Sequence, residues 1–397
     1  MKRRYLLAMM LLLLAACDKE QEGGETPAVE LKGVCTLYVN TPGMQDITSK
    51  SEWMYGATAR LVDPSGNEQP LDTCKIRGRG NTTWNYPKKP YALKLSEGSS
   101  ILGMKSDSRW DLLANWMDRT ELRNDFGFAI ARKAKSLEWT PSGEFVKLKL
   151  NGIDRGLYYI CEHIKIDKYR LDIKGGFLLE LDVNYDETYK FKSDVLNLPV
   201  QVKEPENDEI TADQMKYIRD YFNKVETLLT AEGGPADGWQ DLIDMDSFVD
   251  WWIVEELTQC GESGHPKSCY MHKAPDGKLK AGPVWDFDWG TFRSGSEVTA
   301  FRNRSSIWYP YLFKDPEFVA RVKKKWAESK DDYLSVTTYM QDRAKAISTY
   351  VQSDKELWPM STTTNKDESL SFNAAVERIV ANYKQHIEWM DKQINSL

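Results

Sequence analysis

Two aspartates stand two positions apart in the segment Ala281-Gly-Pro-Val-Trp-Asp286-Phe-Asp288-Trp-Gly-Thr-Phe292. The preceding Val-Trp pair favours a β-strand, so Asp286 and Asp288 are expected on one face with their Cβ atoms roughly 7 Å apart. Two carboxylates this close repel each other unless a cation lies between them. Because Mg²⁺ prefers one or two carboxylates plus substrate phosphate oxygens, the pair indicates a metal-phosphate site. The alternative is that these acids cap turns or pair with Arg293.

A glycine-rich basic loop is the second candidate, with the sequence Arg77-Gly-Arg79-Gly-Asn-Thr-Thr-Trp84 followed by Lys88 and Lys89. Its backbone N–H groups and cations could cradle a phosphate. The more common outcome for such a loop is a solvated basic turn.

Two charged residues interrupt apolar strand-like runs. Lys94 lies in Ala92-Leu-Lys-Leu95, and Glu180 lies in Gly176-Phe-Leu-Leu-Glu-Leu-Asp182. A carboxylate in an apolar run needs a partner, and a lysine such as Lys94 would supply it.

Short strand-like runs bounded by turn residues fill the N-terminal part of the chain and predict an antiparallel β-rich region. The runs are 34–39, 57–62, 73–76, 91–95, 110–115, 145–150, 156–160 and 176–182. The Asn151-Gly152 pair predicts a hairpin between two of them.

Helical patterns dominate after residue 211, over 211–230, 246–257, 315–330, 336–352 and 367–397. The second of these is apolar nearly all round and is therefore expected to be buried. An earlier helix is predicted to begin with a capping box at Asp118-Arg-Thr-Glu121, with Arg123 and Asp125 on its solvated face.

The N-terminal segment is expected to be a targeting signal rather than part of the fold. Lys2-Arg-Arg4 precedes a short apolar run, and Leu14-Ala-Ala-Cys17 resembles a bacterial lipobox, in which the cysteine is lipidated. The alternative is a plain secretory peptide with an incidental cysteine. Residues 1–16 are thus expected to be a lipoprotein signal peptide and 17–32 a disordered tether.

Acidic residues directly after Cys17 resemble the surface-export signal of Bacteroidetes lipoproteins. They predict an outer-membrane lipoprotein at the cell surface, held only by its N-terminal lipid, with the periplasmic face as the alternative. The remaining chain, 33–397, is expected to be one domain with a β-rich part (33–205) and a helical part (206–397).

Charge and aromatic content bound the possible partners. The formal net charge of −7 becomes −10 when Lys2, Arg3 and Arg4 are removed, which argues against a nucleic-acid partner. The chain has 14 tryptophans. Most large aromatic residues are core residues, but a glycan-binding function would be favoured if Trp84, Trp289 and Trp308 lined one groove.

Five cysteines remain besides Cys17, so at least one must be unpaired. In an oxidising compartment, Cys260 with Cys269 is the first candidate disulfide because it closes a short loop, and Cys35 with Cys74 is the second.

Four separated blocks together resemble the spore coat protein H (CotH) kinase family. They are Arg77 to Lys94, Leu112-Leu-Ala-Asn-Trp-Met-Asp118 through Leu122-Arg-Asn124, Gly156-Leu-Tyr-Tyr-Ile-Cys-Glu162, and Gly282-Pro-Val-Trp-Asp-Phe-Asp288. The resemblance covers roughly residues 34 to 330. It implies an α+β, atypical protein-kinase-like two-lobe fold, with a β-rich N-terminal lobe and a mostly helical C-terminal lobe around ATP and metal.

The resemblance also implies site roles. Lys94 would contact the ATP phosphates, with Glu162 or Glu180 as its ion-pair partner. Arg77 and Arg79 would lie in the phosphate-proximal loop, and Asp286 and Asp288 would bind Mg²⁺ or Mn²⁺.

One block departs from the family pattern, which usually shows Asn-x-Asp after the buried helix. Here the aligned residues are Cys260, Gly261 and Glu262. Glu262 reaches about one methylene further than the catalytic aspartate, and a misplacement near 1 Å can cost on the order of 100-fold in rate. His265 is a substitute base or an orienting group for Glu262, or a structural turn residue.

The leading interpretation is a kinase that moves the ATP γ-phosphoryl group to a protein Ser or Thr or to a surface-polymer hydroxyl. Because ATP is scarce outside the cytoplasm, a degenerate kinase-like surface binding protein or adhesin is the second interpretation. A glycan-binding surface lipoprotein is the third.

Overall fold

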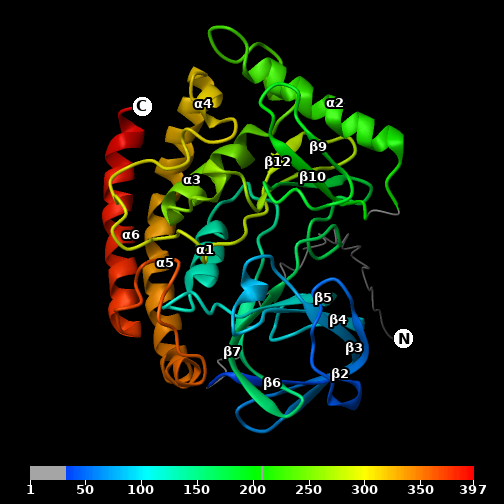
Figure 1. Ribbon diagram of the computed structural model, residues 1–397. Coiled ribbons are helices and arrows are strands. Elements are labelled where there is room, and N and C mark those ends of the chain that lie inside the picture. The colour runs from blue at the N-terminus through cyan, green and yellow to red at the C-terminus, as the bar shows by residue number, and fades with distance from the viewer. Residues whose placement is uncertain (1–32, 207–208) are drawn as a thin grey trace, which may run out of the picture. The chain divides into compact units, whose positions relative to one another are not determined.

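The computed structural model of the protein describes residues 33–206 and 209–397 (Figure 1). The expected signal peptide, the lipidated Cys17 and the tether lie outside the described residues. Within the described ranges, no helix combines the length and apolar character that a membrane crossing requires.

The N-terminal part forms a closed barrel of seven strands in the order β1-β2-β3-β4-β5-β7-β6. Neighbouring strands are antiparallel except β1 and β6, which run parallel and close the barrel. The strands are β1 (Cys35–Asn40), β2 (Met54–Val62), β3 (Glu68–Gly78), β4 (Tyr91–Ser99), β5 (Asp107–Leu113), β6 (Gly143–Leu150) and β7 (Ile153–Glu162).

Alternation along these strands separates a packed barrel interior from an outer face. Leu93, Leu95 and Trp110 belong to the interior core. Side chains alternate along a strand, so Lys94 and Arg109 must point to the outside. The outer face of β3, β4 and β5 is therefore where basic residues gather.

The predicted β6–β7 hairpin is confirmed. Asn151 and Gly152 connect its strands, with φ values of 55° and 77°. Two consecutive positive φ values are what a tight hairpin turn of the I′ type requires, and Asn-Gly is the pair that adopts them most readily.

A second sheet of five strands has the order β12-β11-β8-β10-β9. Its strands are β8 (Phe177–Leu181), β9 (Lys190–Lys192), β10 (Pro199–Glu204), β11 (Cys269–Lys273) and β12 (Leu279–Ala281). Because β11 and β12 come from the part expected to be helical and β11 pairs with β8, this sheet joins the two parts of the chain.

Six α-helices occur in the described residues: α1 (Arg123–Ala131), α2 (Ala212–Leu229), α3 (Met245–Thr258), α4 (Tyr309–Leu312), α5 (Pro316–Leu357) and α6 (Phe372–Asn395). The predictions of α2 and the buried α3 are confirmed. The two helices expected at 315–330 and 336–352 are one 42-residue helix. The intervening Asp-Asp-Tyr-Leu-Ser contains no Gly or Pro, and the buried Tyr333 continues the apolar stripe.

The prediction for α1 is wrong in its start and its environment. The helix begins at Arg123, whose N–H donates to the carboxylate of Asp118 at 2.9 Å, and every residue of α1 is buried. Figure 1 shows α1 in the interior, beside α3 and α5. Arg123 and Asp125 are therefore not on a solvated face. Arg123 forms buried ion pairs with Asp118 and Asp367, and Asp125 forms one with Arg343.

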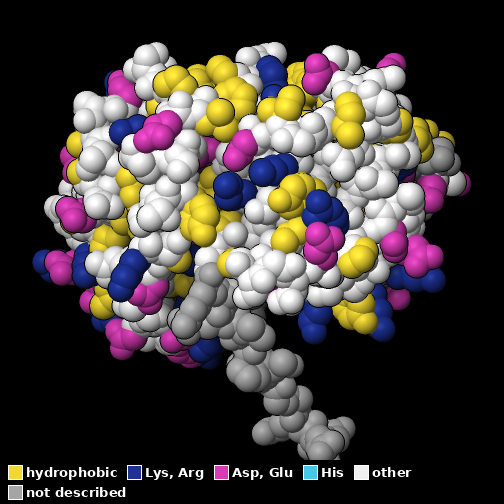
Figure 2. All heavy atoms as spheres, turned by 90° about the horizontal axis from the view of Figure 1, so that it is seen from below, with side chains coloured by type: hydrophobic (Ala, Val, Ile, Leu, Met, Phe, Trp, Pro, Cys, Tyr) yellow, Lys and Arg dark blue, Asp and Glu magenta, His cyan; other side chains and the backbone are white. Residues whose placement is uncertain are grey.

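Neither candidate disulfide is formed, and the three tryptophans considered for glycan binding do not share a groove. All five described cysteines are free and buried. Trp308 is fully buried in the core, Trp84 packs against the barrel core, and Trp289 is 40% exposed, so the three rings do not line one groove. On the face seen in Figure 2, hydrophobic, basic and acidic side chains are interspersed.

Candidate functional site

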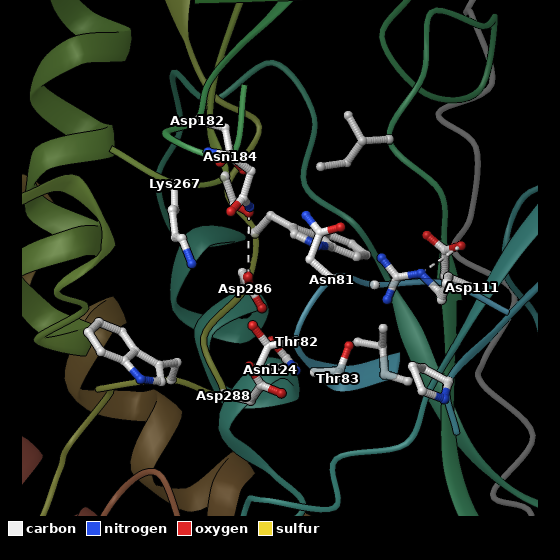
Figure 3. A pocket seen from close by; sticks show the side chains of 18 of the residues that line it. Asn81, Thr82, Thr83, Asp111, Asn124, Asp182, Asn184, Lys267, Asp286 and Asp288 are labelled. Carbon is white, nitrogen blue, oxygen red and sulfur yellow. Dashed lines mark hydrogen bonds and ion pairs between the residues drawn. The ribbon is translucent and has the colours of Figure 1, made fainter. Parts of the chain in front are cut away.

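A cavity of about 810 Å³ lies between the outer face of β3–β5 and the second sheet with its adjoining loops. Basic residues predominate on its barrel side, and its opposite side carries both acids and the cations Lys203 and Lys267. The charged lining residues include Arg77, Arg79, Arg109, Lys203 and Lys267, together with Asp182, Glu262, Asp286 and Asp288. Figure 3 shows Asp182, Asn184, Lys267 and Asp286 directed toward one space, with Asp288 and Asn124 next to it.

The acid pair reaches this cavity from a loop rather than from a strand. β12 ends at Ala281, and Asp286 has a φ of 67°, so the regular alternation expected for a strand does not apply. Both carboxylates nevertheless line the cavity. Burial, followed by the neighbouring Asp286, raises the pKa of Asp288 well above its usual range. Arg293 forms no ion pair with a described residue, so the pairing considered as the alternative is not seen.

Phe287, between the two aspartates, anchors the loop in the core. Its ring occupies the space where a Cβ on Gly127 of α1 would stand, since that atom would come within 2.2 Å of the ring. Its backbone N–H donates to Asn124 Oδ1 over 2.8 Å. Asn365 receives the N–H of Gly290 at 3.0 Å and donates to the carbonyl of Asp288 at 2.8 Å. The loop is thus held from both sides, which fixes where the two carboxylates lie.

The loop after α3 brings Glu262 and His265 to the same cavity. The helix ends where Gln259 adopts a φ of 52°. Glu262 is buried, its Oε2 has no hydrogen-bond partner, and His265 Nε2 lies 4.0 Å from that oxygen. Burial, followed by the charge of Asp286, raises the pKa of Glu262 to about 8. A carboxyl group with such a pKa can exchange protons near neutral pH.

The basic loop also lines the cavity, together with its polar neighbours Asn81, Thr82 and Thr83, which Figure 3 labels. Arg79 lies 3.3 Å from Asp111, and His163 Nδ1 lies 2.8 Å from the same carboxylate. Burial alone would raise the pKa of Asp111, but Arg79 and His163 bring it well below its usual range. Asp111 is therefore an anion that holds the guanidinium of Arg79 in place.

The expected ion pair between Lys94 and a glutamate is not formed. Glu162 binds Arg170 at 2.8 Å, and Glu180 binds Lys203 of β10 at 3.3 Å. Lys94 is on the outer face of the barrel. Neither Lys94 nor Glu162 lines the cavity, whereas Glu180 does. The order of the strands determines the partner of Glu180, because β10, which carries Lys203, pairs directly with β8.

Sequence reasoning missed Lys203 and Asp182. Lys203 lines the cavity, and although burial disfavours its charge, Glu180 and Glu187 raise its pKa. A sequence signal for Lys203 was available. Pro199-Val-Gln-Val-Lys203 is a mostly apolar run with a lysine, like Ala92-Leu-Lys-Leu95. Asp182 follows Glu180 by two positions and lines the cavity.

A metal ion would fit this site only if a bound phosphate supplied some of its oxygen ligands. Among the residues that the structure describes, no three His, Cys, Asp or Glu side chains are arranged to hold a metal ion. Two carboxylates completed by phosphate oxygens are a usual Mg²⁺ environment, and burial followed by the charge of Asp286 raises the pKa of Asp288. Asp286 and Asp288 are thus suited to a metal that arrives with a phosphate.

A cavity lined by both carboxylates and guanidinium and ammonium groups is the arrangement expected of a phosphoryl-transfer protein. The comparison with protein families agrees: the model of the CotH kinase protein family matches residues 76–396, and the chain belongs to this family. The family indicates an atypical kinase, with a kinase-like fold, phosphotransferase activity and ATP as the nucleotide. The search of curated proteins returned no match.

Proposed function

We propose that this protein is a lipid-anchored kinase that uses ATP with Mg²⁺ or Mn²⁺ to phosphorylate a protein Ser or Thr, or another surface hydroxyl. One observation carries the proposal: the acids Asp286, Asp288 and Glu262 and the cations Arg77, Arg79 and Lys203 line a single cavity. Phosphoryl transfer needs positioning and charge neutralisation more than covalent chemistry by the protein. This set of residues is suited to both.

The roles follow from the charges. When bound, ATP with its metal would supply the phosphoryl group. Asp286 and Asp288 would hold the metal, while Arg79 and Lys203 would neutralise phosphate oxygens. Glu262 would accept the proton of the acceptor hydroxyl as that oxygen bonds to the γ-phosphorus and the bond from the γ-phosphorus to the β-phosphate oxygen breaks. Because burial and Asp286 raise the pKa of Glu262 to about 8, its base form becomes more populated as the pH rises through that value.

The direct test is a calorimetric titration of the purified protein with ATP, with and without Mg²⁺. We expect saturable binding that depends on the metal. Absence of nucleotide binding under both conditions would exclude the kinase assignment and leave a surface binding protein.

Replacing Glu262 by Gln separates the catalytic role from binding. Glu262→Gln keeps the size of the side chain but removes the base, so turnover should fall by about 100-fold while ATP affinity changes little. Radiolabelled phosphate transfer and calorimetry measure the two quantities. Detectable wild-type transfer that Glu262→Gln leaves unchanged would exclude Glu262 and direct the search to His265.

A kinase-like protein that binds nucleotide without transferring phosphate is the second candidate function. The departure at Cys260-Gly-Glu262 favours it, since the family pattern has Asn at the position of Cys260 and Asp at the position of Glu262. Glu262→Asp combined with Cys260→Asn rebuilds that pattern and should then raise activity. A double variant as inactive as the wild type, with nucleotide binding retained, would argue against a loop defect as the cause.

The lipid anchor rests on the sequence around Cys17, and the surface location on the acidic residues after it. Lipidation requires the thiol of that residue, so Cys17→Ser protein should leave the membrane fraction for the soluble fraction. Protection of the wild-type protein from protease added to intact cells would indicate the periplasmic face instead.

A further inference from the structure

Three basic side chains form a row across the outer face of the barrel, beside the cavity. Lys75 of β3 is directly opposite Lys94 of β4, and Lys94 is directly opposite Arg109 of β5. Strands lie roughly 4.8 Å apart, so the row extends over about 10 Å. We call Lys75, Lys94 and Arg109 the basic row.

The basic row lacks compensating anions. None of its members forms an ion pair with another described residue. Like charges directly opposite on neighbouring strands destabilise a sheet. The carboxylate of Asp111, on the same strand as Arg109, is already engaged by Arg79 and His163. Asp111 and, less strongly, the exposed Glu206 attract Arg109 without forming an ion pair with it, and the Nε of Arg109 is buried without a hydrogen-bond partner.

Two aromatic rings contact two of these partly exposed cations, Lys75 and Arg109. Trp53 lies 5.1 Å from Lys75 Nζ and 4.7 Å from Arg109 Cζ, measured to the ring centroid. Tyr55, 67% exposed, lies 4.9 Å from Lys75 Nζ. Cation–π contacts of this kind hold charged groups in place without neutralising them. The positive charge therefore stays available to a ligand.

The basic row is continuous with the cavity. Arg109 lines the cavity, whereas Lys75 and Lys94 lie outside it. A ligand on the row would therefore reach the mouth of the cavity without occupying the space of the nucleotide. The acids Asp286 and Asp288, on the other side of the cavity, would repel an anionic ligand and keep it on the barrel side.

We propose that the basic row binds an acidic peptide segment of the protein acceptor and so presents a neighbouring Ser or Thr to the cavity. This inference rests on the proposed kinase function. In an extended peptide, alternate side chains lie roughly 7 Å apart on one face, so two carboxylates match a row of about 10 Å. A nucleic-acid strand is bound along a longer basic groove, which a row of three residues does not provide.

The test uses a fluorescein-labelled peptide of alternating Glu and Ser residues, with a Lys-Ser peptide of equal length as the control ligand. Fluorescence anisotropy measures its binding to the full chain and to Lys75→Glu with Lys94→Glu. We expect this double variant to bind the acidic peptide at least about tenfold more weakly, because two attractive contacts become repulsive. Lys345→Glu with Lys384→Glu, the same charge change at exposed helical positions, should stay within about twofold.

ATP titration of the same variants separates this inference from the kinase assignment. Unchanged metal-dependent ATP binding together with lost peptide binding supports the docking surface. Equal peptide binding by both double variants would overturn it, as would preference of the wild type for a single-stranded oligonucleotide or for the Lys-Ser peptide. Peptide binding that depends on Lys75 and Lys94 in a protein that fails to bind ATP would uphold the surface and reject the kinase.

Discussion

Asp288→Asn should lower metal-dependent phosphoryl transfer by about 100-fold or more, with weaker Mg²⁺-dependent ATP binding and no loss of thermal stability. The carboxylate faces the cavity, and burial and Asp286 raise its pKa, so its charge is unfavourable without a cation. Removing that charge relieves repulsion in the metal-free protein and should leave the unfolding temperature equal or higher. Calorimetry with ATP and Mg²⁺, and thermal unfolding in a chelator, measure both effects.

Asp220→Asn is the matched control, because Asp220 is an exposed residue of α2 that forms, among the described residues, a single ion pair, with Lys216. It should change neither quantity. If Asp288→Asn instead lost much stability and kept its nucleotide affinity, the acid pair would be a structural element of the loop rather than a metal site.

Arg123→Met should lower the free energy of unfolding by about 3–5 kcal/mol, because it leaves buried carboxylates without their partner. Arg123 is fully buried, pairs with Asp118 and with Asp367 at 2.7 Å, and donates to the carbonyl of Thr291 at 2.7 Å. Chemical denaturation measures the loss. Thr291 belongs to the loop that carries the acid pair, so the variant should also weaken metal-dependent ATP binding.

Arg60→Met controls for the chemistry of the substitution, since Arg60 and Glu68 form an exposed pair at 3.1 Å. Such surface pairs contribute about 0–1 kcal/mol. Adding Asp118→Asn and Asp367→Asn to Arg123→Met should recover part of the stability, because the two buried carboxylates left without Arg123 are removed. A loss of less than about 1 kcal/mol for Arg123→Met would show that the cluster is not a stabilising centre.

Local sequence patterns determined much of the scaffold. Alternating apolar residues located the strands of the barrel, Asn151-Gly152 located a hairpin turn, and Thr211 with Gln214 forms a capping box at the start of α2. These features depend on residues near one another in the chain, so their physics is readable without the fold. The motif blocks likewise predicted the family, and Asp286, Asp288 and Glu262 all line the cavity.

Tertiary structure decided which charged groups meet. Glu180 pairs with Lys203 rather than Lys94 because β10, not β4, lies beside β8. Arg123 is buried because α1 lies inside the molecule, where long-range carboxylates such as Asp367 reach it. Residue periodicity reports which face of an element is apolar, whereas the partner of a buried charge depends on strand order and helix packing, which bring together residues far apart in the sequence.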